Sequence, residues 1–250
     1  MDRKSSLLLK EDKWDSAFFN VKIARLNLSG KKPDKSLARR MHGLMKLAMR
    51  ENIAFLVIKL VDPNPAFEEV IRGVNFEECG ESVESTLVYP VSSSGDNSGN
   101  HKVRLFKAGD REEVRNIAKD AFRLSYLYKC GFAKRSIIDS YHMKWAENLT
   151  KDKNAVVFVV DVCSKVAGFI AMSVDELKRI GVIVLVAVKK EYRGLNIGKS
   201  LVQECIKWGI SNVKSIEVKT QKNNKKALSL YEEMGFKVIS TDKVFYKRMI

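Results

Sequence analysis

A short turn with two glycines, RGLNIGKS at Arg193–Ser200, is the part of the sequence best suited to chemistry. It follows the apolar run IGVIVLVAV (Ile180–Val188) and precedes LVQECIKWG, whose apolar residues recur with helical spacing. A buried strand that passes through such a turn into a helix can hold a phosphate, because backbone N–H groups converge at a helix N-terminus, where the helix dipole is positive. The pattern therefore predicts a phosphate-binding turn to which Arg193 and Lys199 add positive charge.

The turn needs a sheet and helices to hold it in place. Three apolar segments that lead up to it predict successive strands, at 155–162, 165–174 and 179–188. Beyond the turn, the pattern predicts a helix at 199–209, a strand at 215–220, a helix at 224–235, and strands at 236–240 and 243–249. Ahead of these elements we expect a strand at 102–108, a helix at 111–123 capped by Asp110, and a helix at 136–149.

The N-terminal part is expected to be a small α/β unit. Its predicted elements are a strand at 18–28, a helix at 34–52, a strand at 53–60, a helix at 64–76 that ends near Gly73, and a strand at 81–89. The stretch VSSSGDNSGN (Val91–Asn100) has the composition of a linker. We therefore expect a small α/β domain at 1–90, a linker at 91–100 and a second domain at 101–250. The first domain is too small for a comfortable core alone, so we expect it to pack on the second.

The charge is concentrated in the C-terminal part. The chain carries a net charge of +15, and residues 101–250 hold 30 Lys and Arg against 16 Asp and Glu, which is +14 of that total. Such a field attracts a nucleotide, a phosphorylated cofactor or a nucleic acid, although a generally lysine-rich composition would give the same excess without any function.

Cysteine spacing and hydropathy narrow the class of protein. The four cysteines lie far apart and form no CxxC pair, so we expect no metal and no redox pair. No apolar run approaches the roughly 20 residues of a membrane helix, and the N-terminus does not resemble a signal peptide. We therefore expect a soluble cytoplasmic protein that does not bind a membrane.

Two motifs resemble the signatures of the GNAT superfamily of acetyl-CoA-dependent N-acetyltransferases. The turn is similar to Arg/Gln-x-x-Gly-x-Gly/Ala, with Arg193 first, Gly198 last, and Asn196 in place of the usual middle glycine. Asparagine is among the few other residues that tolerate left-handed backbone, so this departure does not exclude cofactor binding. The second motif, QKNNKKALSLYEEMGF, is similar to Asn-x-x-Ala-x-x-x-Tyr-x-x-x-Gly-Phe, which puts Asn224, Ala227 and Tyr231 on one helix face. The resemblance covers about residues 101–250.

The resemblance implies a fold, a cofactor and site residues. The implied fold is a mixed, mostly antiparallel twisted sheet flanked by helices, with a partial GNAT-like N-terminal part. Acetyl-CoA is the implied co-substrate, with pantetheine paired to the strand before the turn and pyrophosphate on the turn. The implied cofactor-binding residues are Val186, Ala187, Val188, Arg193, Gly194, Leu195, Asn196, Ile197, Gly198, Lys199, Ser200 and Asn224.

The resemblance also implies direct transfer, with Tyr231 as the proton donor to the leaving thiolate. A phenol with an ordinary pKa of about 10 holds its proton at neutral pH and can give it up locally. A core tyrosine would show the same helical spacing. The general base is left open among Asp175, Glu176, His142 and Glu191, each of which suits a solvated or structural role equally well.

A narrower resemblance concerns the amine acceptor. KWDSAFFNVKIARLNL, AFRLSYLYKCGFAKRSIIDSYHMKWAENL and VKTQKNNKKALSLYEEMGFKVISTDKVFYKRM are similar to the TDP-fucosamine acetyltransferases, which N-acetylate dTDP-4-amino-4,6-dideoxygalactose in bacterial surface-polysaccharide synthesis. This implies a nucleotide-linked amino sugar as acceptor. We expect its pocket to include Leu124–Arg135 with Tyr126 and Tyr128, the helix that carries His142 and Trp145, and the N-terminal part.

Other functions are kept open. A protein, peptide or other small-molecule amine is the alternative acceptor, although a strongly basic domain disfavours basic peptides and polycationic antibiotics. A basic nucleic-acid-binding or regulatory module is the alternative to an enzyme, but no recognised nucleic-acid motif is present. A homodimer is kept open as well.

Overall fold

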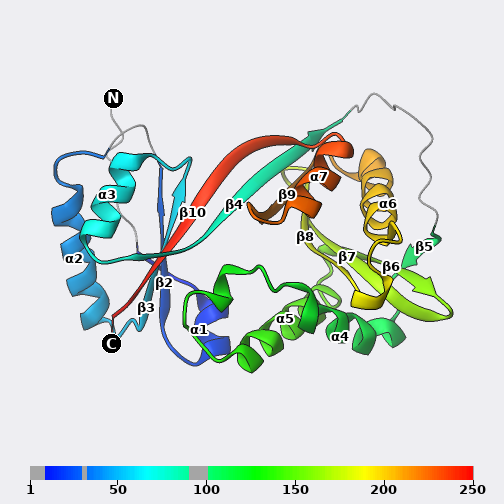
Figure 1. Cartoon of the computed structure of the whole chain (residues 1–250), viewed down its shortest axis with the longest axis horizontal. Coiled ribbons are helices and arrows are strands. Elements are labelled where there is room, and N and C mark those ends of the chain that lie inside the picture. The colour runs from blue at the N-terminus through cyan, green and yellow to red at the C-terminus, as the bar shows by residue number, and fades with distance from the viewer. Residues whose placement is uncertain (1–8, 30–32, 90–100, 250) are drawn as a thin grey trace. The chain divides into compact units, whose positions relative to one another are not determined.

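The structure is a computed structural model that describes residues 9–29, 33–89 and 101–249, and Figure 1 shows how its elements are arranged. The chain divides into two compact units, each discontinuous in sequence. Unit 1 takes Met1–Val83, Ser125–Lys134 and Ser240–Ile250, and unit 2 takes Glu84–Leu124 and Arg135–Ile239. The linker predicted at 91–100 lies outside the described residues, and the domain boundaries expected from sequence stay a prediction.

Unit 1 is a sheet with helices. Its strands are hydrogen-bonded in the order β1-β2-β3-β10-β4, with β2 parallel and β10 antiparallel to β3. The helices α2 and α3 pack their apolar residues, such as Met41 and Ile71, against Ile58 and Leu60 of β3. The elements with residues in this unit are β1 Lys10–Glu11, α1 Lys13–Phe19, β2 Ile23–Leu28, α2 Leu37–Arg50, β3 Phe55–Val61, α3 Pro65–Gly73, β4 Glu77–Val88 and β10 Lys237–Arg248.

Two sequence predictions in this part were wrong. Residues 18–28 are not one strand, because Asp12 caps the short helix α1, Asn20 ends it in left-handed backbone, and β2 begins only at Ile23. The two C-terminal strands predicted at 236–240 and 243–249 are one strand, β10. The polar residues between them looked like a turn, but Asp242 lies opposite Val61 of β3 and is fully buried with Lys59 Nζ at 3.3 Å.

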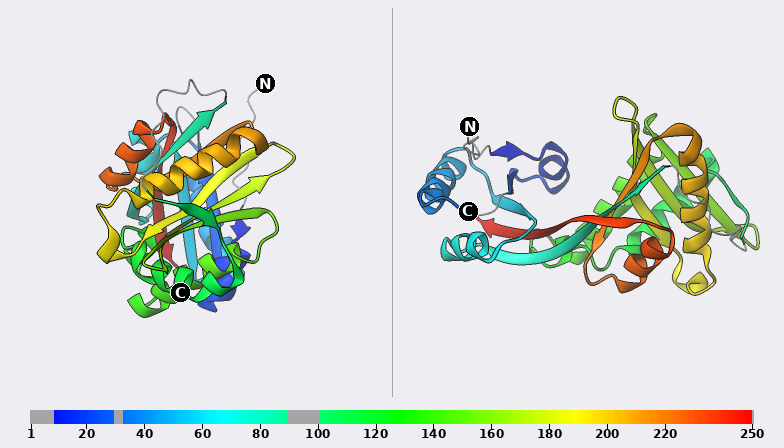
Figure 2. Two further views of the ribbon diagram at one scale, coloured as in Figure 1. Left: turned by 90° about the vertical axis from the view of Figure 1, so that its right-hand side faces the viewer. Right: turned by 90° about the horizontal axis from the view of Figure 1, so that it is seen from above.

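Unit 2 has a sheet with helices on both faces. Its strands follow the order β4-β9-β8-β7-β6-β5, in which β5 to β8 are antiparallel and β8 is parallel to β9. On one face, α6 packs Leu201 and Cys205 against Ile183, and on the other, α4 and α5 pack Ile117 and Ala146 with Leu185 (Figure 2). The elements are β5 Val103–Leu105, α4 Arg111–Ala121, α5 Arg135–Leu149, β6 Ala155–Val162, β7 Lys165–Asp175, β8 Ile180–Val188, α6 Ile197–Asn212, β9 Ser215–Gln221 and α7 Lys225–Glu233.

The expected fold class is confirmed, since helices flank a large, mostly antiparallel sheet. One detail of the helix starts differs from expectation. The Asp110 side chain does not cap α4 itself. It accepts the backbone N–H of Lys107 at 2.7 Å and pairs with Arg104 at 2.7 Å, so it fixes the chain just before the helix.

A glycine brings the end of β8 close to the start of α6. Gly168 of β7 lies opposite Val188, the last residue of β8. A Cβ added at Gly168 would lie 2.9 Å from the Ala187 carbonyl oxygen and 3.1 Å from Ile197 Cγ2. The missing side chain therefore lets β7, β8 and the first residue of α6 approach one another.

We predict that Gly168→Ala destabilises the protein by about 1–3 kcal/mol, because the backbone or the Ile197 side chain must shift to admit the methyl group. Gly109→Ala is the control, since a Cβ there meets no described atom within 4 Å, and its effect should stay within about 0.5 kcal/mol. Urea unfolding of both variants measures the difference. Equal stabilities would show that the close approach at Gly168 is not tight.

Candidate active site

The strands β8 and β9 separate partway along their length. Their parallel pairing runs from Ile180–Ser215 to Ile183–Val218, whereas β8 continues to Val188 and β9 to Gln221. On its other side β8 stays paired with β7, but the register shifts between Ala171–Leu185 and Met172–Ile183, which leaves Val184 as a bulge. A bulge bends its strand and increases the local twist. The last residues of β8 therefore follow β7 and leave an opening toward β9.

The backbone of Val186 faces this opening. The Lys189 N–H donates to the Ala167 carbonyl of β7 at 2.8 Å. Because backbone groups alternate in direction along an antiparallel strand, those of Ala187 point to β7, whereas those of Val186 and Val188 point away from it. The Val188 carbonyl accepts a hydrogen bond from Arg193 Nε at 3.1 Å, which agrees with that direction. Val186 thus presents an N–H and a C=O as an open strand edge.

The turn after β8 is held in unusual backbone conformations. Gly194 has φ of +86° and Asn196 has φ of +59°, in the left-handed region. Asparagine adopts this region more readily than most residues, so it suits the place where the motif usually has glycine. Helix α6 begins at Ile197, and within the described residues the Asn196 side chain makes no capping hydrogen bond. The N–H groups of Ile197, Gly198 and Lys199 therefore stand at the helix start without a side-chain cap.

The glycine at 198 leaves space above the first turn of α6. A Cβ there would have Leu230 Cδ2 at 3.9 Å and Val188 Cγ2 at 4.0 Å as its nearest described neighbours. Packing of the described chain thus does not require a glycine at this position. The Lys199 ammonium pairs with Glu233 of α7 at 2.6 Å, so part of its charge is already balanced.

Two residues near the turn form hydrogen bonds with its backbone carbonyls. Ser200 differs from the other predicted cofactor-binding residues, because its N–H and its hydroxyl both donate to the Asn196 carbonyl, at 3.0 and 3.3 Å. His101 was missed by the sequence analysis. Its Nε2 lies 2.6 Å from the Leu195 carbonyl oxygen and must donate to it, which fixes the turn from a residue 94 positions away. No local pattern indicates such a contact.

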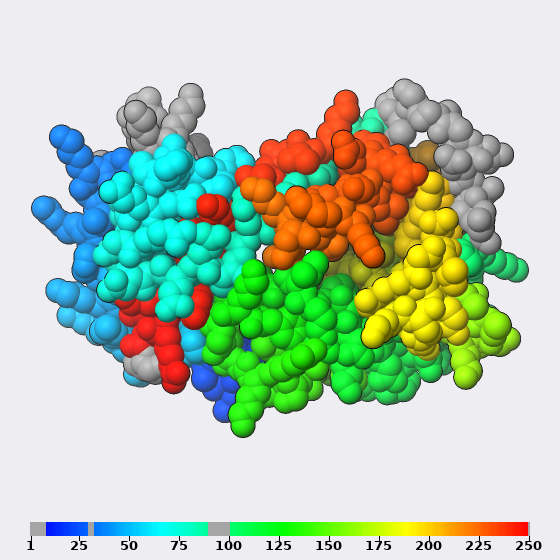
Figure 3. Space-filling view, in the orientation of Figure 1, coloured from blue at the N-terminus to red at the C-terminus, as the bar shows by residue number. Residues whose placement is uncertain are grey.

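Helix α7 carries the predicted proton donor. Tyr231 is buried in the apolar cluster that also holds Ile197, with Val186 packed at its edge. Figure 3 shows a hollow between the orange residues of α7 and the yellow residues of the turn and α6. Burial raises the pKa of the Tyr231 phenol, and the nearby Cys205 raises it further. Its hydroxyl makes no hydrogen bond with the described residues, so it holds a proton that no protein acceptor engages.

Asn224 caps this helix. Its Oδ1 accepts the Ala227 N–H at 3.4 Å, and its Nδ2 donates to Thr220 Oγ1 at 3.2 Å. The side chain thus connects the end of β9 to the start of α7, which fixes the position of Tyr231.

Cys205 of α6 is buried in the same apolar cluster as Tyr231. Burial raises the pKa of its thiol to about 12, so it is not a nucleophile at neutral pH.

The four candidate bases are not gathered at one place. Asp175 accepts the Lys178 N–H at 3.0 Å, and with Glu176 it lies at the β7–β8 hairpin, the end of β8 opposite the turn. His142 is buried between the rings of Phe122 and Trp145, and burial lowers its pKa to about 4. Only Glu191, in the short helix Lys190–Tyr192, lies beside the turn.

The expected acceptor-pocket residues fall into both units. Tyr126 belongs to unit 1, where its hydroxyl accepts from Arg25 Nη1 at 3.0 Å, and Arg25 also pairs with Asp12 and Asp15. Burial raises the pKa of the Tyr126 phenol to about 12, although the Arg25 charge lowers it. This network attaches residues 125–134 to β2. The joint acceptor pocket predicted from sequence remains a prediction.

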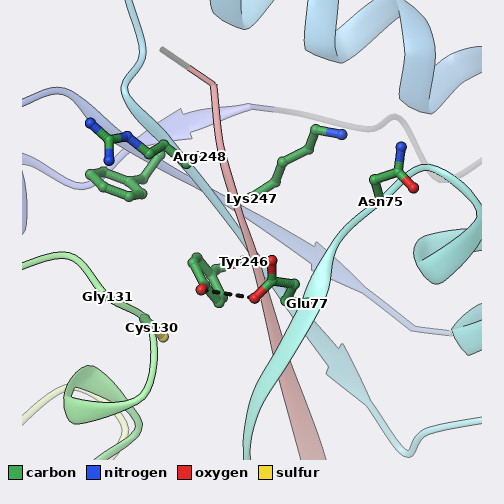
Figure 4. Close-up of a pocket in the computed structure, with 8 residues that line it drawn as sticks. Asn75, Glu77, Cys130, Gly131, Tyr246, Lys247 and Arg248 are labelled. Atoms are coloured by element: carbon green, nitrogen blue, oxygen red, sulfur yellow. Dashed lines mark hydrogen bonds between the residues drawn. The ribbon is translucent and has the colours of Figure 1, made fainter.

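Unit 1 has a pocket of its own, drawn in Figure 4. Tyr246 donates its hydroxyl hydrogen to Glu77 Oε2 at 3.0 Å, and the Lys247 ammonium donates to the Val74 carbonyl at 2.8 Å. Cys130 lies at its edge, and burial raises the pKa of that thiol. Tyr246 and Lys247 are thus engaged by other groups of unit 1, and the Cys130 thiol keeps its proton at neutral pH.

Comparison with known families settles the class of the protein. The profile described as Acetyltransferase (GNAT) family matches residues 112–236, half of the chain. The chain belongs to this family. It is therefore an acyltransferase, and the matched region contains β8, the turn, α6 and α7.

Individual relatives are more distant. The chain is 22% identical to the spore coat polysaccharide biosynthesis protein SpsD of Bacillus subtilis, over 94% of this chain and 81% of that protein. It is 29% identical to an N-alpha-acetyltransferase of Sulfurisphaera tokodaii over 38% of this chain, and spans 65% of the length of that relative. A GCN5-related N-acetyltransferase from Sphaerobacter thermophilus has the same fold, with a TM-score of 0.61 and 14% identity over 90% of this chain and 73% of that one.

Two further observations bear on the class of ligand. No helix in residues 9–29, 33–89 and 101–249 is long and apolar enough to cross a membrane. Across the same residues, no three side chains of His, Cys, Asp or Glu form a group that could hold a metal ion. The absence of a metal in the reaction remains a prediction.

The buried His142 predicts a loss of stability in mild acid. In the unfolded chain its imidazole gains a proton near pH 6.5, whereas in the folded protein it stays neutral down to about pH 4. Between these values the unfolded state binds more protons, so the free energy of unfolding falls as pH is lowered. Between pH 7 and pH 5, we expect His142→Phe to lose about 2 kcal/mol less free energy of unfolding than the wild type. The phenylalanine keeps a ring against Phe122.

Urea unfolding at both pH values measures this difference. His42→Gln, at an exposed position of α2, is the control and should keep the wild-type pH dependence. If His142→Phe lost stability between pH 7 and pH 5 as the wild type does, the imidazole would already be protonated in the folded state or would not be buried.

Proposed function

We propose that the chain transfers the acetyl group of acetyl-CoA to an amine, with the cofactor held along the open edge of β8 and at the start of α6. The observation that carries this proposal is the separation of β8 from β9 beyond Ile183–Val218, directly before the uncapped N-terminus of α6. An extended ligand with amide groups fits the strand edge, and an anion fits the helix start.

Each part of acetyl-CoA then has a matching group. The pyrophosphate would accept hydrogen bonds from the N–H groups of Ile197, Gly198 and Lys199, with the helix dipole behind them. The pantetheine amides would pair with the backbone of Val186. A backbone N–H of the same strand edge would polarise the thioester carbonyl and stabilise the negative oxygen of the tetrahedral intermediate.

Direct transfer is the reaction that this placement favours. The neutral amine attacks the carbonyl carbon, the intermediate collapses with cleavage of the carbon–sulfur bond, and the amine loses a proton to water. Tyr231 donates its proton to the leaving sulfur and is reprotonated from solvent. Because burial raises the pKa of this phenol, the hydroxyl carries its proton at every physiological pH.

For the acceptor, we propose the amino group of a nucleotide-linked amino-deoxy sugar. The excess of positive charge in residues 101–250 favours an acceptor that carries a diphosphate. The relative SpsD, whose name places it in polysaccharide biosynthesis, matches this chain over 94% of its length. A peptide α-amine is the second candidate, because a relative named N-alpha-acetyltransferase matches part of the chain.

Release of coenzyme A measured against dTDP- and UDP-linked amino sugars and against peptides distinguishes these acceptors. Turnover with an amino sugar, and none with peptides, is the result we expect. Turnover with peptides alone would replace the proposed acceptor and leave the proposed cofactor site intact.

The cofactor site is tested by Gly198→Asp. The side chain would enter the space above α6 and bring a negative charge to the pyrophosphate, so acetyl-CoA affinity should fall by at least about tenfold, or 1.4 kcal/mol. Gly198→Ala is the matched control, which adds a methyl group without charge and should affect binding less. Isothermal titration calorimetry measures both, with circular dichroism to confirm folding. Unchanged affinity in Gly198→Asp would rule out this pyrophosphate site.

The proton donor is tested by Tyr231→Phe. General acid catalysis typically raises the rate by a factor of about a hundred to ten thousand. The kcat of this variant should therefore fall by a factor in that range, while its acetyl-CoA affinity stays the same. Stability should change little, because no described residue accepts a hydrogen bond from this hydroxyl. Tyr89→Phe should behave in the opposite way, since the Tyr89 hydroxyl donates to the Ile206 carbonyl at 2.9 Å. It should lose about 1 kcal/mol of stability and keep its kcat. Near-native kcat in Tyr231→Phe would end the catalytic assignment.

A further inference from the structure

A basic pocket in unit 2 shares Val188 and Arg193 with the residues expected to bind the cofactor, but its other lining residues lie outside that set. Three elements line it. Helix α4 contributes Asn116 and Asp120, α5 contributes its first residue, Arg135, and the third is the segment 188–193 at the end of β8. Its volume of about 560 Å³ falls in the range of small-molecule sites. We call it the α4–α5 pocket.

Positive charge dominates the lining of this pocket. Five of its residues are cationic, namely Arg123, Arg135, Lys189, Lys190 and Arg193, and two are acidic, namely Asp120 and Glu191. The lining therefore carries a net charge of +3, from five positive and two negative side chains. Without a ligand, such a concentration of like charge in a hollow is unfavourable.

Two of the five cations are engaged by carboxylates. Arg123 pairs with Asp139 and Asp120, each at 2.5 Å, and Lys189 pairs with Glu113. By contrast, Arg135, Lys190 and Arg193 form no ion pair with any residue that the structure describes, and the contact of Arg193 Nε is with a backbone carbonyl. Within the described chain, three cations around one hollow thus have no carboxylate partner, and one unpaired carboxylate, Glu191, lines the same hollow.

The chemistry of these groups selects the ligand class. Arginine guanidinium groups offer paired N–H donors that match phosphate oxygens, and a lysine adds a further charge. Arg135 is also the first residue of the 15-residue helix α5, so the dipole of that helix adds to the positive potential. A diphosphate is longer than a single phosphate and offers more acceptor oxygens, so it suits several cations that line one hollow.

The pocket and the cofactor turn involve different faces of the sheet. Helix α4, which lines the pocket, packs on the face that holds Leu185 and Ala187, whereas α6 packs on the opposite face with Ile183. Arg193 and the end of β8 lie at the junction between them. A ligand on the α4 face can therefore approach β8 while the cofactor pyrophosphate occupies the start of α6.

We propose that the α4–α5 pocket binds the diphosphate of a nucleotide-linked acceptor, with Arg135 and Lys190 as its principal contacts. This inference rests on the proposed function, because it assigns the pocket to the acceptor of the same reaction. The phosphate chemistry has a second source, the phosphates of coenzyme A itself. The experiment must therefore distinguish these two sources.

The probes are inorganic pyrophosphate and thymidine 5′-diphosphate, titrated by calorimetry into protein saturated with coenzyme A. We expect both to bind. Arg135→Gln and, separately, Lys190→Gln should weaken this binding by about tenfold or more, and should leave the acetyl-CoA affinity within about twofold of wild type. Lys119→Gln is the matched control, because Lys119 is an exposed residue of α4 outside the pocket, and it should bind both probes like the wild type.

Three results would overturn the proposal. If neither probe binds the saturated protein, the pocket holds no diphosphate alongside the cofactor. If the Arg135 and Lys190 variants lose acetyl-CoA affinity instead, the pocket serves a phosphate of the cofactor. If Lys119→Gln weakens binding equally, only the general positive field is at work. Failure of the wild type to bind acetyl-CoA would contradict the proposed function alone, since pyrophosphate binding to the free protein still tests the pocket.

Discussion

The divergence of β8 from β9 is the constraint on which the proposed site depends. The two strands pair in parallel for four residues, and the bulge at Val184 then keeps β8 with β7 while β9 leaves it. A fully paired β8 would have its Val186 backbone groups satisfied by its neighbour and would offer nothing to a ligand. The same divergence ends beside the start of α6, so one local irregularity produces both a strand edge and an adjacent anion site.

The remaining features keep this opening in place. Gly168 allows β7, β8 and the start of α6 to approach closely, and the left-handed backbone of Gly194 and Asn196 turns the chain sharply into the helix. His101 holds the Leu195 carbonyl, and Asn224 fixes the start of α7. These residues need not touch a ligand to matter, because each sets the position of groups that would.

Much of the fold was predictable because it depends on local patterns. Apolar spacing located α2 and α4, and apolar runs located β6, β7 and β8. The turn at 193–200 was visible because glycine and asparagine are required by its backbone. The bulge at Val184 has no sequence signature of its own. The contact of His101 with Leu195 and the continuity of β10 past Asp242 depend on residues distant in sequence. The discontinuous units have the same origin, since the Arg25–Tyr126 contact joins residues 101 positions apart.

The central claim is that the open edge of β8 receives acetyl-CoA, and residue-resolved amide hydrogen exchange tests it most directly. The account predicts that acetyl-CoA slows exchange at the N–H of Val186 and at the N–H groups of Ile197, Gly198 and Lys199, because each gains a hydrogen-bond acceptor. Amides in β6, which is already paired on both sides, should change little. Saturation with acetyl-CoA that left exchange at Val186 and at the start of α6 unchanged would contradict the account.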